Sequence, residues 1–192
     1  MIFTETKIKG VFIIEPVVYK DNRGYFCETF KADEFEKNVG TVHFVQENEN
    51  KSSYGVLRGI HFQNPPFTQA KLARVSDGAV LDVAVDCRKG SPSFGEWVAI
   101  ELSSDNHRQL FLPHGVAHAM LCLSETCVFH YKVDNYYAPQ SEGYIAWDDP
   151  TLNIDWKIPI KDIILSEKDR SHKGFLEQDF PFVYNINSSL VL

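Results

Sequence analysis

The chain has 192 residues, 44% of them hydrophobic and 23% charged, which suits one domain with a sizeable core over residues 1–192. Its 19 basic and 26 acidic residues give a net charge of −7, which argues against nucleic acids and anionic membranes as partners. An anionic small ligand would therefore need a local basic pocket.

The cysteines and the first residues indicate the cellular compartment of the protein. Cys27, Cys87, Cys122 and Cys127 lack C-x-x-C spacing, and no apolar run approaches the length of about 18 residues that a membrane helix needs. The first residues, Met-Ile-Phe-Thr-Glu, are not a basic region followed by a long apolar run. We expect a cytoplasmic protein with free thiols.

The N-terminal part mixes strand and turn patterns. Residues 11–19 are rich in strand formers but contain Pro16, which favours an edge or bent strand that is peripheral or exchanged between subunits. Residues 21–24 (Asp-Asn-Arg-Gly) have turn chemistry, and a strand is expected over 25–30.

The next segment predicts the first helix. Residues 31–38 form a short helix that Gly40 can end, and it is expected to cover an opening of the sheet structure. A strand over 43–45 should follow, with the triplet 46–48 (Gln-Glu-Asn) directly after it.

Two adjacent strands are predicted on either side of the Pro65-Pro66 pair. Over 57–63, alternation places Leu57, Gly59, His61 and Gln63 on one face and Ile60 and Phe62 on the other. A second strand over 69–75 places Lys71, Ala73 and Val75 on one face, so both strands could aim His61 and Lys71 at one ligand. Strict alternation separates Arg58 from His61, and a bend at Gly59 would bring them together.

From Val75 onward, apolar residues recur at every second position. Residues 81–86 and 98–102 have this period, which predicts half-buried antiparallel strands, and turn clusters at 88–94 and 103–107 separate them. We expect an all-β antiparallel jelly-roll β-sandwich, cupin-like, with a few short helices. In residues 127–133, Phe129, Tyr131 and Val133 share a face, so Tyr131 could point inward.

Residues 113–118 carry P-x-G-x-x-H, a motif with which cupins supply metal ligands. The matching first motif has only His61 where metal cupins show H-x-H, which leaves His61 and His118 as good nitrogen donors. We therefore expect no metal and no other cofactor.

Several motifs together carry a resemblance that covers nearly all of the chain. L-R-G-I-H-F-Q over 57–63 and Q-A-K-L over 69–72 resemble the signature of the dTDP-4-dehydrorhamnose 3,5-epimerase family, and D-x-R-G-x-F-x-E over 21–28 and Y-Y-x-P over 136–139 fit the same family. The resemblance implies inversion of C3 and C5 of a dTDP-4-keto-6-deoxy sugar, in dTDP-L-rhamnose biosynthesis, by a homodimer without nicotinamide or metal. Tyr144 departs mildly from the usual family pattern.

The resemblance also implies residue roles. His61 would be the base, Tyr131 the acid, Lys71 the cation that stabilises the enolate, and Asp169 the acceptor for the other ring N–H of His61. The positions that match substrate-binding residues of the family are Arg23, Phe26, Glu28, Gln46, Glu47, Asn48, Arg58, Lys71, His118, Glu142 and Lys168.

Other interpretations of these residues stay open on sequence alone. His61 and His118 could be structural, Tyr131 could be a packing residue, and Ser166 with Asp169 resembles a capping box. The alternative functions are a C3-only or C5-only epimerase, a 3,4-ketoisomerase, a metal-dependent cupin oxygenase and a non-catalytic sugar-binding module.

Overall fold

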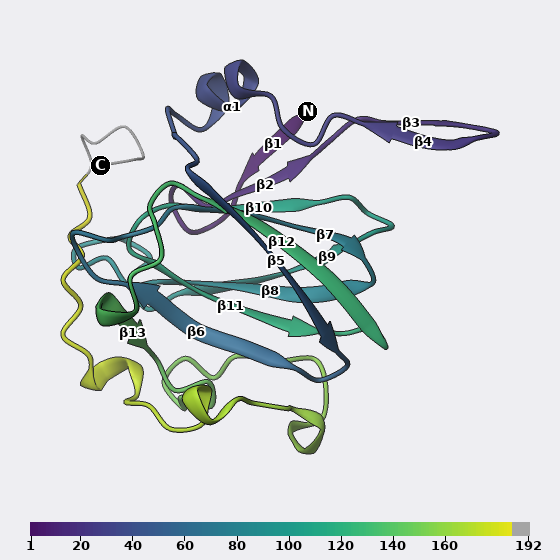
Figure 1. Cartoon of the computed structure of the whole chain (residues 1–192). Coiled ribbons are helices and arrows are strands. Elements are labelled where there is room, and N and C mark those ends of the chain that lie inside the picture. The colour runs from purple at the N-terminus through teal and green to yellow at the C-terminus, as the bar shows by residue number, and fades with distance from the viewer. Residues whose placement is uncertain (186–192) are drawn as a thin grey trace.

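The computed structural model describes residues 1–185, which fold into two antiparallel sheets that face each other (Figure 1). The six-stranded sheet has the order β1 (Ile2–Glu5), β2 (Phe12–Glu15), β10 (Gln109–Leu112), β7 (Lys71–Asp77), β12 (Thr126–Val133) and β5 (Gln46–Ser53). The five-stranded sheet has the order β13 (Glu142–Tyr144), β6 (Leu57–Gln63), β11 (Val116–Cys122), β8 (Ala79–Asp86) and β9 (Trp97–Ser103). The predicted jelly-roll class is confirmed.

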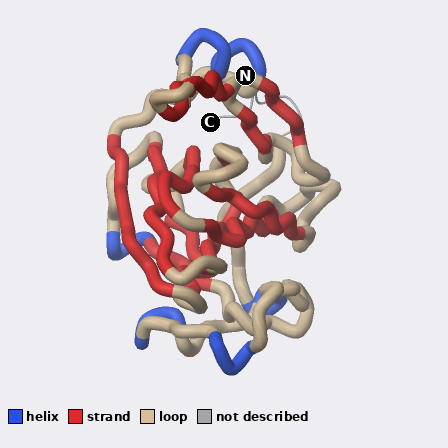
Figure 2. Tube along the Cα trace, turned by 90° about the vertical axis from the view of Figure 1, so that its right-hand side faces the viewer, coloured by secondary structure: helices blue, strands red, loops and turns tan. Residues whose placement is uncertain are grey.

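Helical elements are few and short. They comprise α1 (Ala32–Asn38) and the single 3-10 turns η1 (Pro139–Ser141), η2 (Ile160–Asp162), η3 (Glu167–Asp169) and η4 (Phe175–Glu177). Figure 2 shows them outside the strands. No helix among residues 1–185 is long and apolar enough to cross a bilayer.

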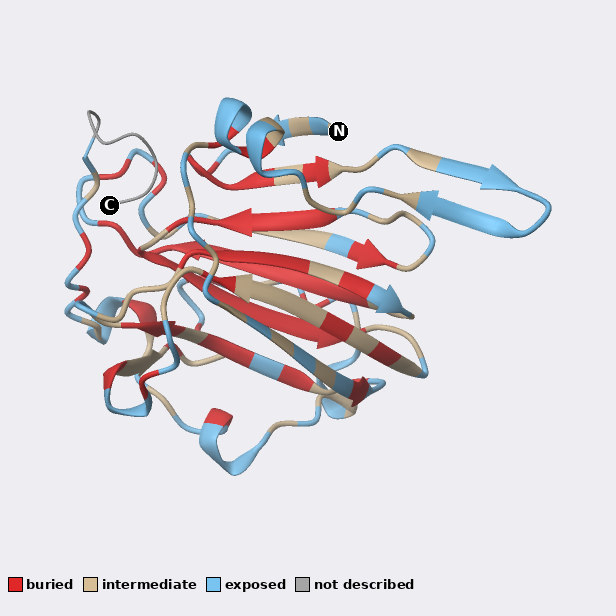
Figure 3. Cartoon of the chain, turned by 45° about the horizontal axis from the view of Figure 1, so that its top comes forward, coloured by how far each residue is buried: buried red, intermediate tan, exposed pale blue. Residues whose placement is uncertain are grey.

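Apolar side chains pack in three layers, because both sheets are covered on their outer faces as well. Val75 and Phe129 meet Val80 between the sheets. On the outer face of the five-stranded sheet, Val83 packs beneath aromatic residues from the C-terminal segment. On the outer face of the six-stranded sheet, α1 contributes Phe35. Figure 3 shows the buried residues concentrated in the strands of these two sheets.

A separate hairpin projects from this body. Strands β3 (Val18–Asp21) and β4 (Gly24–Cys27) pair only with each other and join through the expected turn. Figures 1 and 3 show the hairpin extending away from the sandwich with an exposed surface. Phe26 on this hairpin is 69% exposed.

Three N-terminal expectations are corrected. The segment 11–19 is broken at Pro16, as a bend predicts, but β2 lies between β1 and β10 and is not an edge strand. The strand expected over 25–30 ends at Cys27. Helix α1 lies over the outer face of the six-stranded sheet instead of an opening, because Phe35 packs among apolar side chains of that face.

Two strand expectations also differ from the structure. Residues 43–45 are irregular, and β5 begins at Gln46, so the triplet 46–48 lies within a strand. Strand β8 is buried on both faces and not half-buried, because the facing sheet covers one side and the C-terminal segment the other. Strand β9 is largely half-buried, as predicted.

Candidate active site

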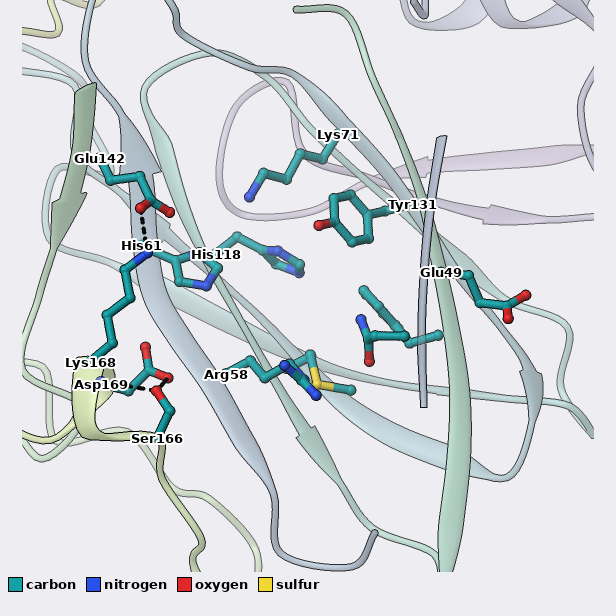
Figure 4. A pocket seen from close by; sticks show the side chains of 13 residues that line it. Glu49, Arg58, His61, Lys71, His118, Tyr131, Glu142, Ser166, Lys168 and Asp169 are labelled. Carbon is teal, nitrogen blue, oxygen red and sulfur yellow. Dashed lines mark hydrogen bonds and ion pairs between the residues drawn. The ribbon is translucent and has the colours of Figure 1, made fainter. Parts of the chain in front are cut away.

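A cavity of about 280 Å³ opens between the two sheets (Figure 4). It adjoins a second cavity of about 300 Å³, and four residues line both: His61, Lys71, Tyr131 and Glu142. The first cavity is also lined by Glu49, Asn50, Arg58, His118, Met120, Phe129, Ser166, Lys168 and Asp169. Segments that lie more than 100 residues apart in the sequence therefore meet at one site.

A bulge in β6 brings Arg58 and His61 to the same face. His118 of β11 pairs with His61, and Met120 pairs with Arg58, so two steps along β11 correspond to three along β6. Gly59 has φ +116°, and a Cβ there would lie 2.5 Å from the carbonyl oxygen of His118, so only glycine fits without movement. The bend expected at Gly59 is confirmed.

The same bulge changes the face of β6 on which Leu57 lies. Leu57 was expected to share a face with His61, but it packs with Ile60 and Phe62 in the outer apolar cluster of the five-stranded sheet. The extra residue in β6 reverses the alternation on its N-terminal side.

His61 has the electrostatic surroundings of a neutral base. Burial lowers its pKa well below the usual 6.5, and the positive charges of Lys71, His118 and Lys168 lower it further. An imidazole in this state can accept a proton at neutral pH.

Lys71 is a buried cation whose Nζ lies 5.8 Å from the centre of the Tyr131 ring but has no hydrogen-bond or ion-pair partner in the described chain. Its side chain lines the same cavity as His61, as predicted, but β7 and β6 are not adjacent strands: they lie in the two facing sheets. Burial lowers the pKa of Lys71 to about 8, and Asp82 and Glu142 oppose this shift. The amine can therefore carry a charge at neutral pH and offer its donors to a ligand.

Tyr131 faces the cavity from β12, the orientation that alternation predicts. Figure 4 shows Tyr131 and His61 entering the cavity from opposite sheets, with Lys71 reaching toward the space between them. Burial raises the pKa of the Tyr131 phenol, which a contact with Asn48 partly offsets. The phenol is protonated at neutral pH and can donate its proton.

Asp169 lies in the cavity wall but has a local partner. Ser166 Oγ donates to Asp169 Oδ2 at 2.5 Å, and Ser166 Oγ accepts from the backbone N–H of Asp169 at 3.3 Å. The capping arrangement is therefore present. No hydrogen bond within the described chain joins Asp169 to the His61 ring.

Polar groups gather at the mouth of the cavity. Glu142 pairs with Lys168 and accepts hydrogen bonds from the hydroxyls of Tyr144 at 2.7 Å and Tyr137 at 3.1 Å. Arg58 Nε donates to Ser52 Oγ at 3.2 Å. These cations supply the local basic pocket that an anionic ligand needs in an acidic protein.

The residues predicted to bind substrate do not all lie together in one chain. Gln46 and Asn48 line the second cavity, whereas Glu47 faces the other side of β5 and pairs with Lys132 at 2.7 Å. Arg23, Phe26 and Glu28 belong to the projecting hairpin and the segment after it, and none of them lines either cavity.

Sequence reasoning missed Asp82 and underrated Tyr144. Asp82 is fully buried and contacts His118, although the alternation of β8 suggested a solvent-facing side chain. Tyr144 pairs with His61 across β13 and β6, and its ring meets the His61 ring edge-on at 6.2 Å. The one available signal for Tyr144 was its departure from the usual family pattern.

The described residues do not form a metal-binding cluster. Residues 1–185 contain no group of three or more His, Cys, Asp or Glu side chains placed to hold a metal ion. Asp82 is hydrogen-bonded to His118 Nε2 at 2.6 Å, and it does not complete a metal site with His61 and His118.

A neutral imidazole and a phenol that enter from opposite sides, with an ammonium between them, can move protons to and from a carbon beside a carbonyl group. The fold and this set of groups define a cupin-like jelly-roll isomerase.

Comparison with known proteins gives the particular family. The sequence model described as dTDP-4-dehydrorhamnose 3,5-epimerase matches residues 5–177. A dTDP-4-dehydrorhamnose 3,5-epimerase of Methanothermobacter thermautotrophicus is 48% identical over 176 residues, which span 91% of this chain and 95% of that protein. The chain belongs to the dTDP-4-dehydrorhamnose 3,5-epimerase family.

Solved structures agree with this assignment. The epimerase of Elizabethkingia anophelis has a TM-score of 0.90 and 48% identity, over 94% of this chain and 99% of that one. The 3,5-epimerase of Legionella pneumophila, solved in complex with dTDP-4-keto-L-rhamnose, has a TM-score of 0.90 and 44% identity over 95% and 98% of the two chains.

Proposed function

We propose that this cavity inverts C3 and C5 of dTDP-4-dehydro-6-deoxy-D-glucose to give dTDP-4-dehydro-L-rhamnose, in the biosynthesis of dTDP-L-rhamnose. The observation that carries the proposal is the convergence of His61, Lys71 and Tyr131 on one cavity from three strands of two sheets. Family membership supplies the substrate.

The first step is removal of a proton beside the C4 ketone. His61 accepts the C3 or C5 proton, because burial and nearby cations keep its imidazole neutral. The carbonyl oxygen gains negative charge as the enolate forms, and the ammonium of Lys71 stabilises it there. Lys71 suits this role since its Nζ makes no competing hydrogen bond or ion pair in the described chain.

Inversion requires that the new proton arrive from the other face of the sugar. Tyr131 lies across the cavity from His61 and donates its phenolic proton to the carbanion carbon. The same set of groups serves C3 and C5, because both carbons flank the C4 ketone. Asp169, beside His61 in the wall, is assigned to steady the imidazole as it gains charge.

The remaining polar residues hold the nucleotide. Arg58 and Lys168 provide positive charge for the diphosphate, while Gln46, Asn48 and Glu142 offer hydrogen bonds from the wall of the second cavity. His118 contributes a ring nitrogen to the first cavity.

The active form is proposed to be a homodimer in the cytoplasm. The hairpin that carries Arg23 and Phe26 leaves its own protomer, so these residues and Glu28 would reach substrate only in a partner's cavity. Glu47 would support substrate binding from outside the cavity, through its ion pair with Lys132.

Proton NMR of the keto sugar in heavy water tests the reaction. The unaltered protein should exchange and invert C3 and C5, and His61→Asn should lower both by about a hundredfold to ten-thousandfold. Tyr131→Phe should form the enolate and retain exchange while inverted product falls sharply, since the phenol proton is missing. His43→Asn, an exposed histidine, is the matched control and should behave as the parent.

The outcomes separate the alternatives. Exchange at one carbon alone would identify a single-site epimerase, and a moved carbonyl would identify a ketoisomerase. A protein that binds the sugar without any exchange would be a binding module, and turnover lost on chelation would indicate a metal-dependent enzyme. Near-parental inversion by Tyr131→Phe would remove the acid role from Tyr131.

A further inference from the structure

The carboxylate of Asp82 is partnered in an unusual way. Asp82 lies on β8 with no exposed surface, its Oδ1 is 2.6 Å from His118 Nε2, and its Oδ2 is the only buried side-chain N or O atom among residues 1–185 without a hydrogen-bond partner. Burying a carboxylate is costly unless it is paired and hydrogen-bonded. A group held at this cost requires an explanation from the site it faces.

Asp86, four residues further along β8, accepts hydrogen bonds on both of its carboxylate oxygens. Arg88 Nε donates to its Oδ1 at 2.8 Å, and the hydroxyls of Ser91 and Ser93 donate to its Oδ2 at 2.5 and 2.7 Å. Asp86 is equally buried, and neither carboxylate lines a cavity itself. Only Asp82 contacts a side chain, His118, that does line one, so its sparse hydrogen bonding belongs to its position behind that histidine.

His118 lies between Asp82 and the cavity. The ring of His118 lines the cavity and stacks on Phe129, with centroids 6.0 Å apart and planes at 24°. Because Asp82 occupies Nε2, Nδ1 is the ring nitrogen that a ligand can use. The carboxylate therefore determines which nitrogen of His118 serves the cavity.

We propose that Asp82 is a positioning residue for the epimerase reaction: it holds His118 as an imidazolium whose Nδ1–H joins the ammonium of Lys71 in stabilising the enolate oxygen. The inference rests on the proposed function. The contact of 2.6 Å is that of a charge-assisted hydrogen bond, in which Nε2–H donates to the carboxylate.

This arrangement assigns opposite charge states to two paired histidines. His61 and His118 are direct partners across β6 and β11, but only His118 has a carboxylate on its ring. Positive charge on Lys71 and His118 lowers the pKa of His61, after the larger effect of burial, so His61 stays the neutral base. A carboxylate on one imidazole and none on the other gives the two histidines different roles in proton transfer.

Asp82 also supports the charge of Lys71. Burial lowers the pKa of Lys71, and Asp82 is the first of the two carboxylates that raise it again. The other ionisable groups that face this cluster are Arg58 and His61 from β6, Tyr131 from β12, Glu142 from β13, and Lys168 and Asp169 from η3. Glu49 from β5 lines the cavity as well, but its side chain is largely exposed and pairs with His130 at 3.5 Å. Glu142 is bonded to Lys168 and Asp169 to Ser166, so Asp82 is the fully buried countercharge on the inner side.

The variant Asp82→Asn tests the inference, with solvent exchange and inversion followed across pH. An amide keeps the volume but not the charge, so kcat should fall about tenfold to a hundredfold with little change in KM, as when an interaction made only in the transition state is lost. The alkaline limb of the kcat/KM profile should move to lower pH, because Lys71 loses a countercharge. Asp86→Asn is the matched control and should lower Tm without moving the profile.

A purely structural Asp82 would lower Tm and leave the pH profile and the kcat of the folded enzyme unchanged, and that result would overturn the inference. A second measurement needs no variant of Asp82 and no turnover. In ¹⁵N-histidine-labelled protein at pH 7, the signals assigned to His118 by their loss in His118→Asn should show both ring nitrogens protonated. A neutral His118 ring would overturn the inference, whereas failure of the unaltered protein to exchange sugar protons would overturn the proposed function and leave this measurement intact.

Discussion

At the scale of single residues, charged groups in and beside the cavity are not fully hydrogen-bonded by the fold. Lys71 Nζ makes no hydrogen bond or ion pair in the described chain, and one oxygen of Asp82, behind His118, has no hydrogen-bond partner. Elsewhere in the described interior, comparable groups such as Asp86 are bonded throughout. Unpaired buried charge costs stability, so its concentration here indicates groups kept for a ligand.

Lys71 gives a prediction about pH. The proposed mechanism needs a neutral His61 and a charged Lys71, so activity should persist to well below pH 6.5 and decline as pH rises through about 8. The folded protein releases the Lys71 proton near 8, while the unfolded chain keeps it to about 10.5. Because the unfolded state binds more protons in that window, this residue's contribution to stability should rise between about pH 8 and 10.5.

The variant Lys71→Met isolates that contribution. At pH 7 it should be more stable than the parent by up to about 3 kcal/mol, because it buries no ammonium, and it should lose turnover. Urea unfolding at pH 7 and pH 10, beside the exposed control Lys51→Met, measures the effect. A less stable Lys71→Met at pH 7 would show that the buried amine is compensated in the free protein.

At the scale of elements, the short strand β13 connects His61 to the mouth of the cavity. Tyr144 pairs with His61, donates its hydroxyl proton to Glu142, and stacks on His172 with centroids 4.4 Å apart. Lys168 Nζ lies 5.2 Å from the centre of the same ring. One aromatic side chain therefore contacts the proposed base and two groups proposed to bind substrate.

Two substitutions of Tyr144 separate its ring from its hydroxyl. Tyr144→Phe keeps the ring beside His61 but releases Glu142, so KM should rise about threefold to tenfold with kcat nearly unchanged. Tyr144→Leu also removes the edge contact and should lower kcat, since the imidazole is then less well held. Steady-state kinetics of both variants decides the matter: equal kcat values would mean that the ring does not orient His61.

At the scale of the whole molecule, one protomer does not bring all the family-matched residues together. The β3–β4 hairpin exposes Tyr19, Tyr25 and Phe26 and holds Arg23 far from its own cavity. Within the described chain this hairpin pairs with no other strand. An exposed aromatic hairpin of this kind is suited to contact a second copy.

Mixed dimers test that arrangement. Arg23→Ala and His61→Asn should each be nearly inactive alone, but their coexpressed mixture should recover about a quarter of parental activity, because half of random dimers contain one complete site. Light scattering should show a dimer for both variants. Recovery should be absent if each hairpin serves its own cavity or if the protein is a monomer.

Local patterns in the sequence predicted the local features. Alternation placed Lys71 and Tyr131 on cavity-facing sides, and Gly59 marked the bend that brings Arg58 beside His61. Helix α1 was found within one residue of its observed limits. These features follow from chain geometry over a few residues, which a sequence pattern records directly.

Which segment covers each strand depends on long-range contacts that local patterns do not record. Apolar residues at every second position of β8 predict a strand with one solvent-exposed face. In the structure, Trp156 and Phe180, far along the chain, cover its outer face. Asp82 consequently became a buried partner of His118, and β2 became an inner strand because β1 and β10 flank it. Burial and partners depend on contacts between distant segments, and no pattern within a single strand specifies which segment will lie against it.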